Sequence, residues 1–269
     1  MGRTPPGRPG RGGPGLRHHG EVPATDPLAG IDDVDWASLG ATYGTAEAVP
    51  GLLRGLLGDD ADRRVAALDE LWSTLLHQGT IYPSAPAVVP FLVAVAADHR
   101  VSDGVRAEVA LLLANLTAAS SFATTPQQWF VVAFARDGDD PQPEVELDQV
   151  CRERLAALVD RLDPVLAAGP PRARVATIAV AATVAASLSA DARGALAALA
   201  DDPDPRVATA AGVTLDLADG APLTAADLLA RAAVDADAVD LLEHIPTWPP
   251  AVQAVDLVVE LCERAVATR

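Results

Sequence analysis

The sequence predicts an all-α fold, and three observations indicate it. Apolar residues recur at the i, i+3, i+4 and i+7 spacing of helices that bury one face. A short segment led by Arg recurs four times, which is typical of folds built from repeated units. Alternating apolar and polar strand patterns bounded by Gly are nearly absent. With 269 residues, 50% of them hydrophobic, and a mean hydropathy of +0.21, the chain can bury a core.

The first helices are expected soon after residue 45. Thr45 can cap a helix that runs towards Leu57. A longer helix then opens at Arg64, and its apolar stripe is expected to face the core. That stripe consists of Val65, Leu68, Leu71, Trp72 and Leu75.

The recurring segments each place an Arg at the start of a long helix, after a turn that holds acids or Pro. Shorter apolar stretches at 49–57, 89–96 and 195–199 precede three of these helices. The spacings are 42, 68 and 32 residues, and the long one fits one repeat plus an insertion. We expect each guanidinium to be architectural and to bond towards the neighbouring repeat. The four residues are Arg64, Arg106, Arg174 and Arg206.

This pattern resembles HEAT repeats, in which a short helix, a turn with Asp and a helix opening with Val-Arg or Arg-Val alternate. The resemblance covers about residues 46 to 218. The stretch from His77 to Pro83, with Trp36 and Val49-Pro50 upstream, is also similar to uncharacterised HEAT-repeat proteins of high-GC, actinobacterial-type bacteria. The resemblance implies a right-handed α-solenoid of stacked helical hairpins, whose long second helices form one extended face.

Three regions are expected to depart from the repeat. Residues 1–25 are rich in Arg, Gly and Pro and predict a disordered tail, outside a solenoid of residues 30–269. Residues 119–145 hold an irregular insertion in which Trp129 is either a packing residue or an exposed anchor for a partner. Residues 219–269 predict degenerate repeats.

The charge narrows the classes of partner. All 20 basic residues are Arg, against 37 acids, so the formal charge is −17, and the chain beyond residues 1–20, which hold four Arg and no acid, carries −21. A surface of this sign repels nucleic acid and attracts basic proteins or peptides. No apolar run is long enough for a membrane-spanning helix, so the expected location is the cytoplasm.

Motifs for catalysis, cofactors and metals are missing from the sequence. It contains no phosphate-binding loop, nucleophile elbow or zinc motif, and residues 137–144 lack the Gly and bidentate acid of a calcium loop. We therefore expect no enzyme, cofactor or metal. Cys151, near Arg152 and Arg154, is either a slightly activated thiol or a structural residue. Cys262 lies in an apolar stripe and is expected to be buried.

The sequence thus favours a non-catalytic scaffold that binds a basic protein through an acidic helical face. The candidate contact residues are His77, Tyr82, Trp129, Asp69 and Glu70. His77 has a second interpretation, as a donor to the last carbonyls of its helix. Two other functions stay open: a HEAT-like enzyme of the alkylpurine-glycosylase or chromophore-lyase kind, and a toxin-neutralising immunity-type binder.

Overall fold

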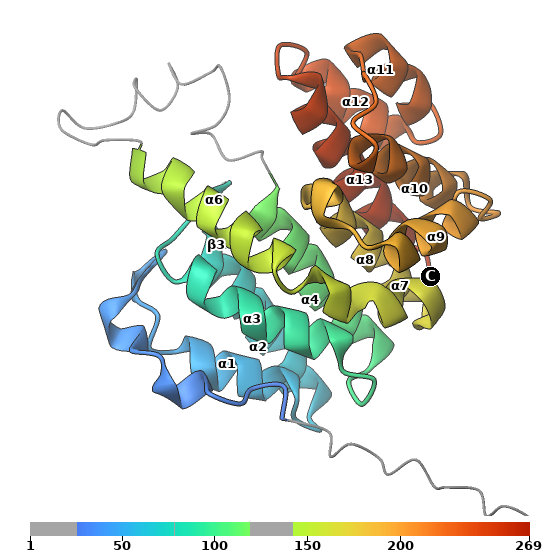
Figure 1. The fold of residues 1–269 in the computed structure, drawn as a ribbon. Helices are drawn as coiled ribbons and strands as arrows, with labels where there is room; N and C mark the ends of the chain where they lie inside the picture. Colours follow the sequence, from blue (N-terminus) through green and yellow to red (C-terminus); the bar gives the residue numbers. More distant parts are fainter. Residues whose placement is uncertain (1–25, 78, 119–141) are drawn as a thin grey trace, which may run out of the picture.

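The computed structural model describes residues 26–77, 79–118 and 142–269 and confirms the all-α class (Figure 1). The predicted tail lies outside the described residues. So does the predicted insertion as far as residue 141, whereas residues 142–145 belong to a helix.

The N-terminal part holds two short hairpins that the sequence did not indicate. Strand β1 (Gly40–Ala41) pairs with β2 (Gly44–Thr45), and β3 (Leu76–His77) pairs with β4 (Thr80–Ile81). The predicted helix cap at Thr45 is therefore wrong, because helix α1 is Val49–Leu56, with Pro50 in its first turn. Before these elements come two 3-10 helices, Ile31–Asp33 and Trp36–Ser38.

Helix α2 (Ala61–Leu75) begins at Asp60, whose carboxylate accepts hydrogen bonds from the amides of residues 62 and 63. The helix buries Ala67, Leu71 and Leu75, whereas Val65 is 60% exposed. The expected stripe was wrong at Val65 because α2 packs mainly against α1, and no described element covers the side of α2 that carries Val65.

The core lies where four longer helices meet. These are α3 (Ala85–Ala97), α4 (Asp103–Thr117), α6 (Gln142–Ala156) and α8 (Pro171–Thr183). Helix α4 has its most extensive contact with α8, and α3 packs against both α4 and α6. Helix α8 packs directly against α4. The described residues therefore contain no complete helical repeat between these two helices. The length between Arg106 and Arg174 is taken up partly by α6, the 3-10 helix Val159–Leu162 and the short helix α7 (Asp163–Ala168).

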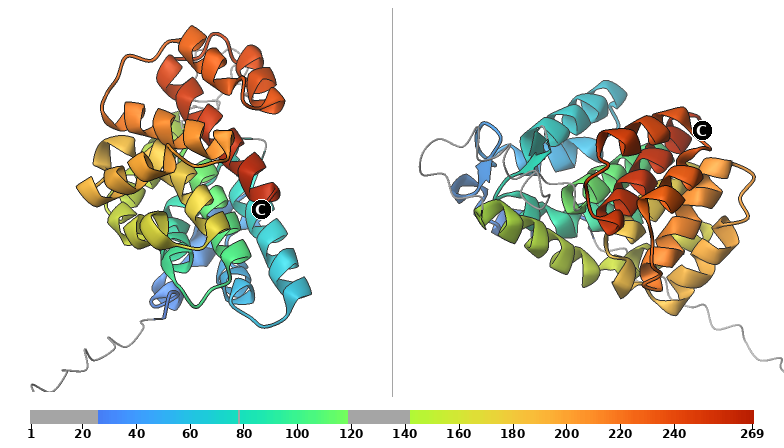
Figure 2. Two further views of the ribbon diagram at one scale, coloured as in Figure 1. Left: turned by 90° about the vertical axis from the view of Figure 1, so that its right-hand side faces the viewer. Right: turned by 90° about the horizontal axis from the view of Figure 1, so that it is seen from above.

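The C-terminal half continues with the 3-10 helix Ala185–Ser187 and then five helices. They are α9 (Ala190–Leu199), α10 (Pro205–Ala218), α11 (Ala225–Ala232), α12 (Ala236–His244) and α13 (Pro250–Ala267). The last helix returns across α10 and α8 and touches α4 (Figure 2). The expectation of an open face along the long second helices is therefore wrong at α8 and α10, because α13 covers them.

Both cysteines are buried thiols. Cys151 lies well inside α6 rather than at its start, is 0% exposed, and burial raises its pKa to about 12. Burial likewise raises the pKa of the Cys262 thiol. The interpretation of Cys151 as an activated thiol is therefore wrong, since a thiolate at this position would be desolvated.

The buried Asp148 on α6 makes the stability of the fold depend on pH. Its carboxylate is 1% exposed, one oxygen accepts from Arg152 Nη1 at 2.5 Å, and the other has no hydrogen-bond partner among the described residues. Burial outweighs Arg152 and raises the pKa of Asp148 to about 6. A raised carboxyl pKa means that the folded state holds the proton more tightly, so stability falls as the pH rises from about 4 to about 6.

We expect Asp148→Asn to remove the loss of stability that occurs as the pH rises. The free energy of unfolding of the variant, minus that of the wild type, should rise by about 2 kcal/mol between about pH 4 and about pH 7. Urea denaturation at both pH values measures it, and taking the difference cancels the other titrating groups. A difference that stays constant with pH would contradict the burial of an ionised Asp148.

Candidate functional site

Most of the predicted contact residues lie on one stretch of chain at the end of α2. Asp69 and Glu70 are exposed on the helix, His77 is in β3 and half-buried, and Tyr82 follows β4 and is also half-buried. Trp129 lies outside the described residues. Among the described residues, the His77 side chain makes no hydrogen bond to the last carbonyls of α2; its ring lies against Tyr43 instead.

The structure adds Tyr43, which sequence reasoning missed. It sits at the tip of the β1–β2 hairpin, is 79% exposed, and its ring centroid lies 5.8 Å from that of His77 in an edge arrangement. The hairpin is tied to the end of α2, because the amide and hydroxyl of Thr42 both donate to the carbonyl of Thr74 at 3.1 Å. The signal in the sequence was an aromatic residue in a turn bounded by Gly40 and Gly44.

Tyr43, Asp69, Glu70 and His77 are named here the α2-end surface. Thr74, which anchors the Tyr43 hairpin, is one helical turn after Glu70, so the acids and the aromatic pair share one end of α2. In the described part of the chain, neither Asp69 nor Glu70 forms an ion pair.

Two other acids on the long helices form ion pairs within the fold. Glu108 lies 3.8 Å from Arg172, and Asp216 lies 2.6 Å from Arg231. An acidic side chain that already has a cation contributes less to attracting a partner. Of these acids on the long helices, the two without an ion pair among the described residues are therefore on α2.

Three of the four recurring Arg residues bond to the fold. Arg64 Nη1 donates to the Gly58 carbonyl at 2.7 Å, and the buried Arg106 donates from Nε to the Ala96 carbonyl at 2.9 Å. Arg206 bonds to the Asp204 carboxylate and reaches α13, where its Nη2 donates to Thr268 Oγ1 at 2.9 Å. These contacts match the architectural role, although only Arg206 among them reaches a helix far along the chain.

Arg174 differs from the other three. Its Nε is buried, and within the described ranges its guanidinium makes no hydrogen bond or ion pair. The cause is visible in the sequence: Asp204 stands two residues before Arg206, whereas Arg172 stands two residues before Arg174. Arg174 therefore lacks the acid that holds Arg206, and among the described residues no backbone carbonyl takes its place as one does for Arg64 and Arg106, so the predicted architectural contact of Arg174 was wrong.

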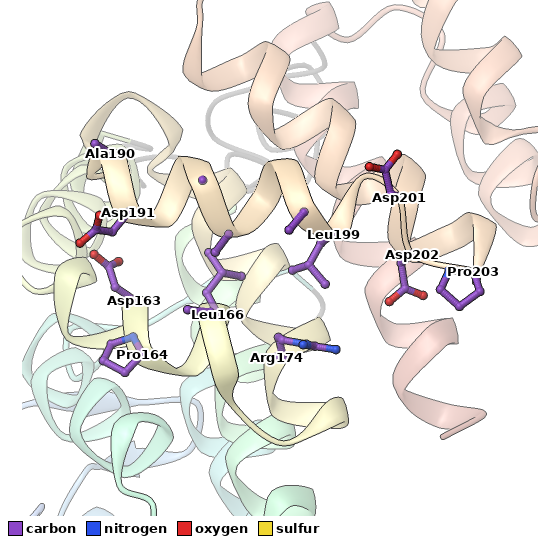
Figure 3. Close-up of a pocket in the computed structure, with 14 residues that line it drawn as sticks. Asp163, Pro164, Leu166, Arg174, Ala190, Asp191, Leu199, Asp201, Asp202 and Pro203 are labelled. Atoms are coloured by element: carbon purple, nitrogen blue, oxygen red, sulfur yellow. The ribbon is translucent and has the colours of Figure 1, made fainter.

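Arg174 lines a groove between α7 and α9 with a volume of about 710 Å³ (Figure 3). Leu166 and Leu199 contribute apolar surface, and residue 194 of α9 is Gly. The same groove carries four carboxylates. They are Asp163, Asp191, Asp201 and Asp202.

The four carboxylates differ in their partners. Asp163 accepts from Ser189 Oγ at 2.6 Å, and Asp202 is 3.1 Å from Arg269 Nη2. Asp191 and Asp201 form no ion pair among the described residues. Figure 3 shows Asp163 and Asp191 pointing toward one another, whereas Arg174 lies farther along the groove on the side of Asp202. One region of the groove therefore carries two facing carboxylates, and another presents Arg174, which has no ion pair among the described residues, on the side of Asp202.

Two further observations bear on chemistry. In the described ranges, no group of three or more His, Cys, Asp or Glu side chains is placed to hold a metal ion. No helix there has the length and apolar character needed to cross a bilayer. Comparison of the chain with protein-family models, curated proteins and solved structures gives no match.

Proposed function

We propose that the chain is a non-catalytic, cytoplasmic scaffold, a right-handed α-solenoid of HEAT-like hairpins, that binds a basic protein or peptide. The α2-end surface carries this proposal. Helix α2 carries two exposed carboxylates that form no ion pair among the described residues, and its C-terminal end holds an aromatic ring that is 79% exposed and lies against His77. Protein interfaces commonly combine an aromatic anchor with a charged rim.

The charge of the chain supports a basic partner over a nucleic acid. Association with a cation-rich chain is accelerated by a field of opposite sign, whereas phosphates are repelled. Tyr82 and Trp129 remain predicted contact residues of the same partner, beside Tyr43.

A labelled peptide of alternating Arg and Gly tests the proposal. Raising the salt concentration from about 50 to about 500 mM should slow its association strongly and change its dissociation little, because rim charges act through steering. Glu70→Gln should slow association, and Tyr43→Ala should speed dissociation, each by about fivefold, as measured by surface plasmon resonance.

Glu243→Gln is the matched control, since Glu243 is an exposed acid on α12, at the opposite end of the molecule from α2 (Figure 1). If Glu70→Gln and Glu243→Gln slowed association equally, the overall charge of the chain would explain the attraction, and a defined binding surface would be contradicted. Tight binding of duplex DNA at moderate salt would favour the glycosylase-like alternative instead. Neutralisation of a co-encoded nuclease would identify the basic partner as a toxin.

A further inference from the structure

We infer that the groove between α7 and α9 is a second binding site, distinct from the α2-end surface, and that it takes a peptide segment carrying one basic and one acidic side chain. The basic group would lie at Asp163 and Asp191, and the acidic group at Arg174. The inference does not depend on the proposed function, because none of these residues belongs to the α2-end surface.

The guanidinium of Arg174 supports binding of an acidic group. The Nε of Arg174 is buried, whereas its Nη groups are not among the buried unpartnered atoms and lie at the groove, where a carboxylate is the acceptor that binds a guanidinium best. Arg174 is the one recurring Arg without such an acceptor in the described residues, and it faces the groove rather than a neighbouring helix. Its side chain is therefore available to an acidic group of a ligand.

The carboxylates are the second argument. With four Asp side chains and one Arg, the groove lining is strongly negative overall. The Ser189 hydroxyl leaves the charge of Asp163 in place, and in the part of the chain that the structure describes Asp191 forms no ion pair. Two carboxylates that point toward one another repel, and a guanidinium or ammonium between them relieves the repulsion.

The shape of the groove is the third argument. A Cβ built at Gly194 meets nothing within 4 Å, so the wall formed by α9 leaves open space there. Leu166, Ala195 and Ala198 line the same space, and the methylene stem of Arg or Lys packs well on such small apolar surfaces. The volume of about 710 Å³ accommodates a few side chains of an extended peptide.

Four peptides of the same Ala-Ser backbone, with both termini blocked, test the charge requirement. One carries Arg and Glu, one Arg and Gln, one Gln and Glu, and one Gln twice. We expect the Arg-Glu peptide to bind the wild-type protein about tenfold more tightly than either singly charged peptide, by fluorescence anisotropy. Arg174→Gln should abolish the preference for Glu, and Asp191→Asn should weaken the preference for Arg.

Gly194→Leu tests the location, because the new side chain fills open space in the groove without a clash. It should remove binding of the Arg-Glu peptide. Gly51→Leu is the control: Gly51 is an exposed helical Gly with open space at its Cβ, and it lies on α1. Thermal melts verify that each variant is folded.

Unchanged binding to Gly194→Leu, or a preference for Glu that survives in Arg174→Gln, would overturn the inference. So would binding that needs a free C-terminal carboxylate, or equal affinity for the four blocked peptides. Tyr43→Ala should leave the Arg-Glu peptide unaffected, so this site and the α2-end surface can fail separately.

Discussion

Arg106→Ala should lower the melting temperature by about 5–10 °C, whereas Arg174→Ala should change it by no more than about 2 °C. Arg106 is 4% exposed, and burial lowers the pKa of its guanidinium. Its removal would leave the Ala96 carbonyl without its donor and a void against α3, a cost of about 2–4 kcal/mol. Arg174 makes no bond within the described residues, so its side chain contributes little to the fold.

Differential scanning calorimetry of the two variants at the same pH measures this contrast. Arg206→Ala should fall between them, because Arg206 loses a partly exposed ion pair with Asp204 and the contact to Thr268. Equal losses for Arg106→Ala and Arg174→Ala would mean that the recurring Arg acts through its position in the repeat and not through the bonds described.

Leu257→Ala should destabilise the protein by about 2–5 kcal/mol, the cost of a cavity at a close-packed position. Leu257 is 0% exposed on α13, the helix that lies across α8 and α10. The midpoint of urea denaturation should fall while its slope stays constant, since the same surface is exposed on unfolding.

Leu229→Ala makes the same chemical change on a side chain that is 40% exposed and should cost less than about 1 kcal/mol. If both substitutions cost the same, α13 would not be an integral part of the core. A lower slope for Leu257→Ala would instead indicate that α13 detaches before the rest of the chain unfolds.

The parts of the fold that could be predicted from the sequence are those set by local spacing. The long helices at Arg64, Arg106, Arg174 and Arg206 follow from apolar periodicity, and three of them, those at Arg64, Arg106 and Arg206, also have an acid at the helix start. Their order along the chain was therefore accessible. The exposure of Val65 was not, because it depends on which side of α2 a distant helix covers.

The candidate sites depend on contacts between residues that are far apart in sequence. The Tyr43–His77 pair spans two hairpins of two-residue strands, which are too short to produce an alternating pattern. The groove joins residues of α7, α8 and α9, and no single segment of the sequence reveals it. One local signal was available, since Arg172 stands where the related repeat has Asp204.

The return of α13 across α8, α10 and α4 has a consequence for biosynthesis. In a stack whose units touch only their neighbours, each hairpin can dock as soon as it leaves the ribosome. Here Asn115 of α4 donates to Glu263 of α13, a contact that spans 148 residues. The surfaces of α8 and α10 that contact α13 stay open to water until α13 has emerged, so the nascent chain exposes apolar surface between the synthesis of α10 and that of α13. Chaperone demand and aggregation should therefore peak just before α13 is released, and stalled chains that lack it should be the species that aggregates.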